Sequence, residues 1–325
     1  MAKPFRLYMC SDIHASERAW RKFVNAMRAN VYKVDAALIA GDLTGKALVA
    51  VVRDEGKGAG GEVWTADLLG QRRVARGEAE LMELERAIAD VGYYAVRVTE
   101  AERAAMDADP GLVKRGFHEH ITRRVAEWMA LAAERLDGSD VPVYLMPGND
   151  DDFEIDPVLA ESAYCRNVNE QVVDLGPQHQ LVSMGWSSPT PWSTPRELPE
   201  AVFLDRLSDL MKGVRDPRRT VMMTHVPPYD SGLDTAPLLS PDLRPTASAG
   251  DLLRGPVGST GVRTAVETFK PLLGVHGHIH ESGGERVVAQ TLCLNAGSEA
   301  NHGILRGFLI DLDGSTVTRT LRVEG

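Results

Sequence analysis

Cysteine is scarce in this chain of 325 residues, and the three that occur, Cys10, Cys165 and Cys293, are widely spaced. No pair has the CxxC spacing of the common thiolate zinc sites and redox motifs, so neither kind of site is expected. Cys10 and Cys293 lie inside apolar runs, which predicts buried free thiols and no disulfide framework. Stability must therefore come from a hydrophobic core, and a hydrophobic content of 43% is sufficient for one.

Long apolar runs and an excess of positive charge are also absent. Nowhere do ~18 consecutive apolar residues occur, the length that a membrane-spanning helix needs, and the start has no signal-peptide pattern. The 46 acidic and 36 basic residues give a net charge of -10, which works against non-specific binding to nucleic acid or anionic membranes. The sequence therefore predicts a cytoplasmic globular protein without a membrane partner, and it disfavours nucleic acid as a partner.

Five short apolar runs each lead into a residue type that binds metal ions. Their length of three to five residues and their boundaries at Gly, Pro or Asp predict buried strands. The runs are Leu7–Cys10, Ala36–Ala40, Val143–Met146, Val221–Met223 and Leu272–Val275. The first two flank an amphipathic helical pattern, which predicts a βαβ unit and parallel pairing. Because ligands of open α/β sheets bind beyond the carboxyl ends of the strands, we expect the residues after these runs to meet.

Residues 46–138 differ in character from the rest and are expected to form an insertion between two strands. Leu48 to Val52 and Glu62 to Leu69 flank a glycine-rich stretch and predict an antiparallel hairpin with a long turn. Helices are expected after it, one of them starting at the capping-box pattern Thr99–Glu102. We expect a single domain over residues 1–325, with the insertion acting as a cap or as an interface between copies of the chain.

The metal-binding residue types form a recognisable set, although each alone has an ordinary explanation as a turn or core residue. In chain order they read Asp-x-His, Gly-Asp, Gly-Asn-x-Asp, a lone His and Gly-His-x-His, each after an apolar run. In this respect the sequence resembles the calcineurin-like metallophosphoesterase superfamily, over residues 5–45, 141–155 and 219–300. The resemblance implies an α/β fold of two packed mixed β-sheets flanked by helices, an α-β-β-α sandwich.

The resemblance also implies seven ligands for two divalent metal ions. Carried over by motif, they are Asp12, His14, Asp42 and His280 for one ion, and Asp42, Asn149, His225 and His278 for the other. Asp42 would bridge the two ions. Carboxylate, amide and imidazole ligands without thiolate suit Mn, Fe, Co or Zn, of which manganese is favoured. In the family, a metal-bridging hydroxide attacks phosphorus, and two cations are needed to neutralise the phosphoester and to lower the pKa of water.

One position departs from the family pattern, which usually reads Gly-Asn-His-Asp or Gly-Asn-His-Glu. The slot of that histidine, which assists the leaving group in the family, holds Asp150. Asp150 is therefore the candidate catalytic residue, and Asp151 and Asp152 are expected beside the second ion as well. His302, near the carboxyl end of the resemblance, is a candidate for substrate contact. His118, inside the insertion, is expected at a helix surface.

The function that these residues favour is a dinuclear metal-dependent phosphodiesterase acting on a small or medium phosphodiester such as a nucleotide. One alternative is a phosphomonoesterase of the same chemistry. Another is a nuclease, which the acidic charge and the lack of a basic, aromatic-rich strip disfavour. A third is a non-catalytic metal-binding scaffold, which would be expected to have lost ligands. Since all seven ligand positions are filled, we expect an enzyme whose partner is a small-molecule phosphoester, and homo-oligomers through the insertion.

Overall fold

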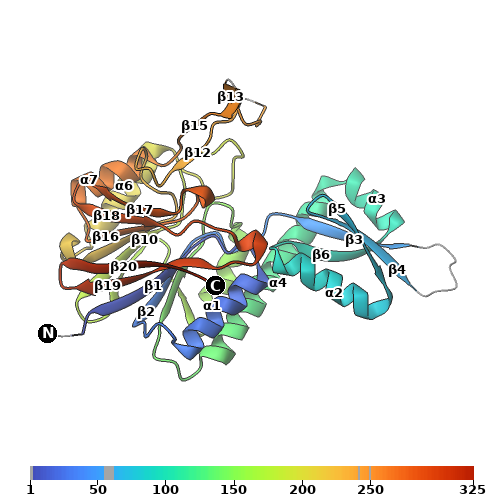
Figure 1. Cartoon of the computed structure of the whole chain (residues 1–325), viewed down its shortest axis with the longest axis horizontal. Helices are drawn as coiled ribbons and strands as arrows, with labels where there is room; N and C mark the ends of the chain where they lie inside the picture. The colour runs from blue at the N-terminus through green and yellow to red at the C-terminus, as the bar shows by residue number, and fades with distance from the viewer. Residues whose placement is uncertain (1–2, 55–61, 241, 249) are drawn as a thin grey trace.

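Two six-stranded mixed β-sheets form the centre of the molecule (Figure 1). The computed structural model describes residues 3–54, 62–240, 242–248 and 250–325. The first sheet contains, in spatial order, β20 (Thr316–Glu324), β19 (Arg306–Asp313), β1 (Phe5–Cys10), β2 (Ala36–Ala40), β7 (Val143–Met146) and β8 (Cys165–Asn167). The second contains β17 (Gly284–Val288), β18 (Thr291–Asn295), β16 (Leu273–His276), β11 (Thr220–Thr224), β10 (His179–Met184) and β9 (Gln171–Leu175).

Alternating side chains along the strands create three hydrophobic layers. In β1, Leu7 and Met9 face the second sheet, whereas Tyr8 and Cys10 face the helices on the other side. The helices that cover the two sheets are α1 (Glu17–Ala29), α4 (Pro110–Leu136), α5 (Asp156–Ala160), α6 (Glu200–Met211) and α7 (Thr260–Phe269). The first three pack on the first sheet and the last two on the second. The four layers confirm the predicted fold of two packed mixed sheets flanked by helices.

The parallel strands bring the expected ligand segments to one edge of the sheets. All five predicted strands are present, as β1, β2, β7, β11 and β16. β1, β2 and β7 are parallel neighbours in the first sheet, and β11 and β16 are parallel neighbours in the second. Asp12, Asp42, Asn149, His225 and His278 each follow the carboxyl end of one of these strands. The loops after the strands therefore start from positions that the sheets hold rigidly.

Residues 48–54 and 62–108 form a separate, smaller layer beside the two sheets, with a hydrophobic core of its own (Figure 1). Its elements are β5 (Gln71–Arg76), β4 (Val63–Leu68), β3 (Leu48–Asp54), β6 (Tyr94–Thr99), α2 (Gly77–Asp90) and α3 (Glu100–Ala108). The predicted antiparallel hairpin is observed as β3 and β4, and the expected capping box starts α3. Most of the turn expected between the two strands, residues 55–61, lies outside the described residues. The layer also has two strands that the pattern analysis missed, β5 and β6.

Helix α4 connects this layer to the main body. Its buried residues belong to the same hydrophobic cluster as those of α1. Trp128 of α4 stacks on Trp20 of α1 with ring centroids 4.7 Å apart and planes 6° from parallel. The indole Nε1 of Trp128 also donates a hydrogen bond to Glu17 at 2.7 Å. The segment 46–138 thus contains both a separately packed layer and one long helix of the central core.

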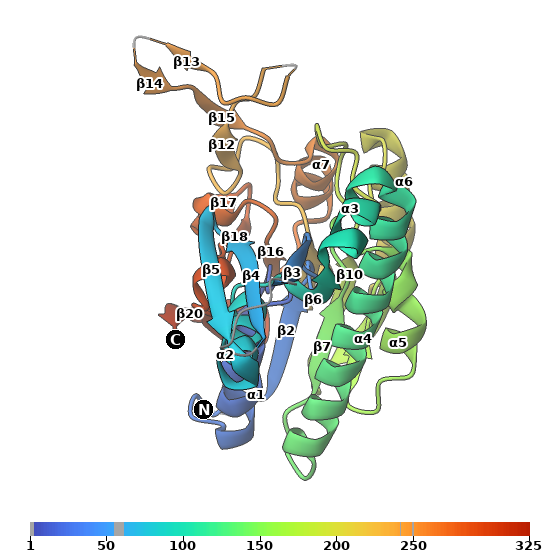
Figure 2. The same ribbon diagram turned by 90° about the vertical axis from the view of Figure 1, so that its right-hand side faces the viewer.

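A narrow arm projects from the carboxyl-terminal half of the chain (Figure 2). It consists of β12 (Thr235–Pro237), β13 (Ala247–Ser248), β14 (Asp251–Leu252) and β15 (Arg254–Pro256), paired as two short antiparallel ribbons. The described residues also contain four short 3₁₀ helices, η1 (Phe153–Ile155), η2 (Pro217–Arg219), η3 (His280–Ser282) and η4 (Ala300–His302). Among the described residues, no helix has the length and apolar character needed to cross a membrane.

Candidate metal centre

Carboxylate and imidazole side chains from four loops converge at the carboxyl edge of the sheets. Asp12, His14 and His280 form one group whose ligand atoms lie within 4.8 Å of one another. Asp12, Asp42 and His225 form a second such group, so Asp12 and Asp42 both stand near the centre. Nε2 of His225 is 3.3 Å from Asp42 Oδ2, and Nε2 of His280 is 3.3 Å from Asp12 Oδ1. Such a cluster of carboxylates and imidazoles is suited to divalent metal ions.

The backbone at these ligands adopts a conformation that non-glycine residues rarely take. Asp12, His14, Asp42 and His278 have φ of 54°, 44°, 54° and 68°. A left-handed conformation in a non-glycine residue costs on the order of 1–3 kcal/mol and is typical of functional sites. Two hydrogen bonds between the loops hold it in place, from Asp12 N to Gly41 O and from His14 N to Asp42 O, both 3.0 Å long.

Two of the histidines are oriented by backbone carbonyl groups. Nδ1 of His225 lies 2.7 Å from Ala40 O, and Nδ1 of His14 lies 3.3 Å from Thr44 O. In the neutral form of such an imidazole, the proton lies on Nδ1, which donates to the carbonyl, and the lone pair of Nε2 is presented to the cluster. Nε2 of His225 is fully buried and has no hydrogen-bond partner among the described residues. A buried, unpartnered imidazole nitrogen aimed at two carboxylates is the arrangement expected of a metal ligand.

Asn149 also has a buried polar atom without a hydrogen-bond partner among the described residues, its amide oxygen. Its Nδ2 donates to Asp150 Oδ1 at 2.9 Å and to Thr194 Oγ1 at 3.0 Å, so both amide hydrogens are used. Its Oδ1 is buried and has no hydrogen-bond partner in the described part of the chain. The oxygen is therefore free to accept a further contact. Thr194, in the proline-rich loop after β10, was not identified from the sequence, because only the folded loop brings it to Asn149.

Gly148 precedes Asn149 because the chain passes very close to Asp42 at this point. A Cβ atom on Gly148 would lie 2.2 Å from Asp42 Oδ1 and 2.4 Å from Asp42 N. A side chain there would displace the central carboxylate. Glycine is therefore required by the close approach of the two loops.

Asp150 points into the cluster and pairs with a lysine that the sequence analysis did not single out. Its Oδ2 is 2.8 Å from Nζ of Lys46, and its backbone N donates to Asp42 Oδ1 at 3.1 Å. Asp150 also shares a group of possible ligand atoms with His14 and Asp42. Burial works against the charge on Asp150, but the positive charge of Lys46 outweighs it and lowers the pKa of Asp150. Asp150 is therefore an ionised carboxylate close to Asp42.

The expectation that Asp151 and Asp152 also lie beside the metal is corrected by the structure. The Asp151 carboxylate is fully buried and turned away, accepting hydrogen bonds from the backbone N–H groups of Leu43, Thr44 and Gly148 at 2.7–3.0 Å. It therefore fixes the loop after Asp42 to the loop before Asn149. Asp152 points to the inserted segment instead. Successive residues of a turn point in different directions, so a run of three aspartates cannot all face one site.

His118 of α4 is the residue that Asp152 meets, with Nε2 3.1 Å from Asp152 Oδ2. Its Nδ1 lies 3.4 Å from Glu154, so the imidazole bridges two carboxylates of the loop after β7. His118 is half-buried. The expected helix-surface histidine is thus a contact between α4 and the ligand loop.

His278 and His302 differ in how they relate to the cluster. The ring of His278 lies against that of His225, with centroids 5.2 Å apart, and its backbone N donates to the carboxylate of Asp12. His302 lies in η4 and is exposed. In the described ranges, His302 forms no hydrogen bond or ion pair with the seven ligand candidates, and its contact with substrate stays a prediction.

The ionisation of the cluster follows from burial and from crowding of its charges. Burial raises the pKa of Asp42, and burial lowers the pKa of His14 and of His278 to about 3, so both imidazoles are neutral. Burial also disfavours charge on His225, but the adjacent Asp42 outweighs it and raises the pKa of His225. The cluster therefore holds a proton on the His225–Asp42 pair that an incoming cation would displace.

The inserted layer touches the ligand loops directly. Oγ of Ser16 donates to Asp90 O at 2.6 Å, just after the loop that carries Asp12 and His14. The backbone N of Gly45, three residues after Asp42, donates to the hydroxyl oxygen of Tyr94 at 2.9 Å. Asp90 and Tyr94 stand at the two ends of the turn between α2 and β6, so this turn makes both contacts.

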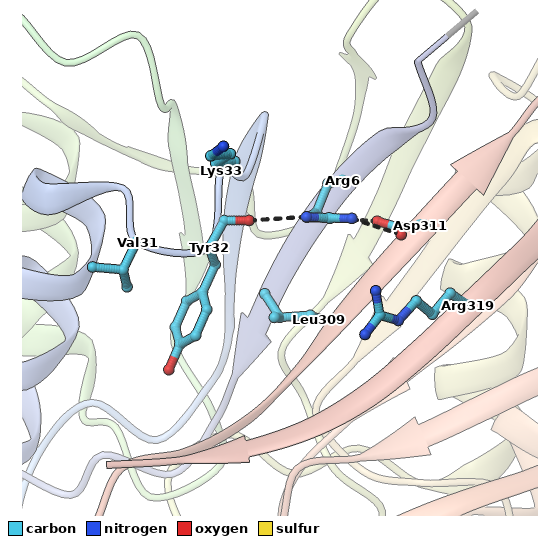
Figure 3. Close-up of a pocket in the computed structure, with 7 residues that line it drawn as sticks. All are labelled: Arg6, Val31, Tyr32, Lys33, Leu309, Asp311 and Arg319. Atoms are coloured by element: carbon cyan, nitrogen blue, oxygen red, sulfur yellow. Dashed lines mark hydrogen bonds and ion pairs between the residues drawn. The ribbon is translucent and has the colours of Figure 1, made fainter. Parts of the chain in front are cut away.

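A cavity of about 200 Å³ lies at the other end of β1 and is a different feature (Figure 3). It is lined by Arg6, Val31, Tyr32, Lys33, Leu309, Asp311 and Arg319. Arg6 donates to Asp311 Oδ1 at 2.6 Å and to Tyr32 O at 3.2 Å. Because β1 rises by about 3.3 Å per residue, its two ends are about 17 Å apart. The cavity is thus remote from the cluster.

Comparisons with known proteins place the chain among proteins of the same fold. No family model matches it. An uncharacterized protein of Methanocaldococcus jannaschii is 26% identical over 155 residues, which is 47% of this chain and 62% of that protein, less than two thirds of its length. The structure of TT1561 of Thermus thermophilus has a TM-score of 0.54 at 15% identity, covering 98% of each chain. Another crystal structure has a TM-score of 0.56 at 15% identity, covering 99% of this chain and 98% of the other. Likeness at this identity shows a shared fold.

Proposed function

We propose that this protein is a dinuclear metal-dependent phosphodiesterase of the calcineurin-like metallophosphoesterase type. The observation that carries the proposal is the convergence of the motif residues on one cluster, in which His225 Nε2 and Asn149 Oδ1 are buried without hydrogen-bond partners among the described residues. The donor set has oxygen and imidazole nitrogen and no thiolate, which suits Mn, Fe, Co or Zn, with Mn as our first choice. When bound, two such ions would neutralise a phosphoester and lower the pKa of a water molecule.

The chain's own residues would divide the work as follows. Asp12, His14 and His280 would hold one ion, Asn149, His225 and His278 would hold the other, and Asp42 would bind both. Backbone carbonyl groups orient His14 and His225, and Asp151 fixes the loops that carry Asp42 and Asn149. Contacts within the chain thereby set the positions of the side chains that would hold the ions.

A diester is favoured over a monoester because the position expected for a proton-donating histidine holds Asp150. This carboxylate accepts hydrogen bonds from Lys46 and Asn149 and has no proton to give. Monoesters with poor leaving groups depend most on protonation of the departing oxygen, so they should be poor substrates. A phosphomonoesterase of the same chemistry is the second candidate.

The test combines metal analysis with a substrate screen. The protein reconstituted with Mn is assayed with bis-(p-nitrophenyl) phosphate, p-nitrophenyl phosphate, cyclic nucleotides and a short DNA. We expect two ions per chain, cleavage of the diester and loss of activity on chelation. The variant Asp42→Asn should lose both ions. Its matched control is Asp35→Asn, at the opposite end of β2, which should keep both ions. One ion or none after Mn loading would overturn the dinuclear proposal, and a preference for p-nitrophenyl phosphate would favour the monoesterase.

The insertion is proposed to act as a cap that restricts substrates or as an interface between copies of the chain. Its contacts with the ligand loops support an effect on the site. Because the turn between α2 and β6 touches those loops, the test should spare it and remove the hairpin formed by β4 and β5, residues 62–76. An unchanged substrate profile and an unchanged mass in solution would contradict both roles for that hairpin.

A further inference from the structure

Lys46 places a positive charge in a site otherwise built from carboxylates and imidazoles. Its Nζ is 2.8 Å from Asp150 Oδ2, and 55% of its side chain remains exposed. In the part of the chain that the structure describes, no other lysine or arginine forms an ion pair with Asp12, Asp42 or Asp150. The ammonium is therefore both anchored at the cluster and accessible from solvent.

The backbone that carries Lys46 is held on the side of the site. Asp151 accepts hydrogen bonds from Leu43 N and Thr44 N, and Tyr94 accepts one from Gly45 N. These contacts fix the three residues between Asp42 and Lys46. The base of the Lys46 side chain is thus set by the same contacts that hold the central carboxylate, and Asp150 sets the position of its end.

We propose that Lys46 is a substrate-binding residue that contacts the anionic oxygens of a phosphoryl group, with Asp150 positioning its ammonium. This inference rests on the proposed phosphoesterase function and names a further contact for its substrate. An ammonium has three N–H donors, and the carboxylate of Asp150 uses one, so two remain for phosphate oxygens. Charge-assisted hydrogen bonds of this kind are about twice as strong as neutral ones. The role is charge stabilisation and requires no proton transfer.

The alternative is that Lys46 only neutralises Asp150. The two roles differ in a double-mutant cycle, in which inorganic phosphate is the probe and its affinity for the Mn-loaded protein is measured by calorimetry. Lys46→Met keeps the apolar stem and removes the charge. We expect it to weaken phosphate binding about tenfold or more, with two metal ions per chain retained and the melting temperature unchanged. Lys46→Arg should recover part of the loss.

The decisive measurement is made in the Asp150→Asn background, where there is no carboxylate to neutralise. Weaker phosphate binding in Lys46→Met/Asp150→Asn than in Asp150→Asn supports direct contact, and equal binding overturns it. Lys212→Met is the matched control, because Lys212 also pairs with an aspartate, Asp209, at 2.6 Å but lies at the exposed end of α6. It should bind phosphate like the wild type, and a loss equal to that of Lys46→Met would show a general charge effect and refute the contact.

The outcomes also separate this inference from the proposed function. Wild-type protein that binds neither Mn nor phosphate would overturn both. Wild-type protein that binds both, together with unchanged phosphate binding in Lys46→Met, would overturn the role of Lys46 alone.

Discussion

Gly92 lies where the inserted layer closely approaches the loop that carries His14. Its substitution tests whether this contact helps to position the candidate metal ligands. It lies in the turn between α2 and β6 with φ of +91°. A Cβ atom there would lie 2.0 Å from the carbonyl oxygen of His14. Since ordinary contacts between carbon and oxygen are no shorter than about 3.3 Å, Gly92→Ala must push the two loops apart by more than about 1 Å.

Two effects add up in this variant, and a control separates them. The positive φ costs an alanine roughly 1–2 kcal/mol, and crowding against backbone adds roughly 1–3 kcal/mol. Gly70→Ala is the control, because Gly70 lies in the same layer with φ of +74° but has nothing within 4 Å of the added Cβ. We therefore expect Gly92→Ala to lower the free energy of unfolding by about 2–5 kcal/mol and Gly70→Ala by only about 1–2 kcal/mol.

The assay has two readouts, thermal unfolding and titration with Mn. Displacement of the His14 carbonyl should move the imidazole of the same residue. Gly92→Ala should therefore lower the affinity for the ion that His14 would hold by about tenfold or more, which is about 1.4 kcal/mol. Gly70→Ala should bind metal normally. Equal stabilities and equal metal affinities in the two variants would refute the idea that this contact supports the site.

Three further predictions concern the cluster itself. Asp42→Asn should cost both metal ions, whereas Asn149→Ala should cost only one; metal analysis checks this, and equal loss in the two variants contradicts the assignment. Metal binding should release a proton and strengthen as pH rises, because Asp42 raises the pKa of His225 and the cation must displace the proton of that imidazole. Calorimetry in buffers of different ionisation enthalpy measures this release, and finding none would contradict the prediction. Hydrolysis rates should fall steeply as the leaving-group pKa rises, because Asp150 is ionised and paired; a flat dependence that steepens in Asp150→Asn would identify Asp150 as the acid after all.

The strands and the candidate ligands that follow them could be predicted because both depend on short-range sequence patterns. Each candidate ligand stands within a few residues of the end of an apolar run, and an apolar run of this length bounded by Gly, Pro or Asp favours a strand. Parallel pairing of such strands then brings their carboxyl ends to one edge. The convergence of Asp12 on Asp42 and His225 is therefore a consequence of topology, and local motifs were sufficient to anticipate it.

The sequence could not predict contacts that depend on long-range packing. Lys46 and Asp150 are 104 positions apart, and nothing near either residue in the chain signals the pair. The strand Gln71–Arg76 was missed because its mostly exposed positions carry arginine and glutamine, so it shows no alternation of apolar and polar residues. The short strand Tyr94–Thr99 was missed because its pairing with β3 depends on the crossover through α2. The direction in which each side chain of a turn points cannot be predicted from the sequence either. For this reason Asp151 and Asp152 were wrongly expected beside the metal.

The energetic cost of the strained ligands explains why so many hydrogen bonds surround them. Four candidate ligands in left-handed conformations, at about 1–3 kcal/mol each, would together offset much of the roughly 5–15 kcal/mol by which a typical protein is stable. The chain offsets this with contacts between loops that would otherwise be independent. The carboxylate of Asp151, buried where an unpaired charge would be very costly, is satisfied by the backbone of two ligand loops. Relaxing either loop would break some of these hydrogen bonds, so the buried carboxylate of Asp151 helps to hold the strained conformation at Asp42 in place. The distances between the ligands are for this reason a property of the folded chain, and a change at Asp151 should disturb the metal centre although its side chain points away from it.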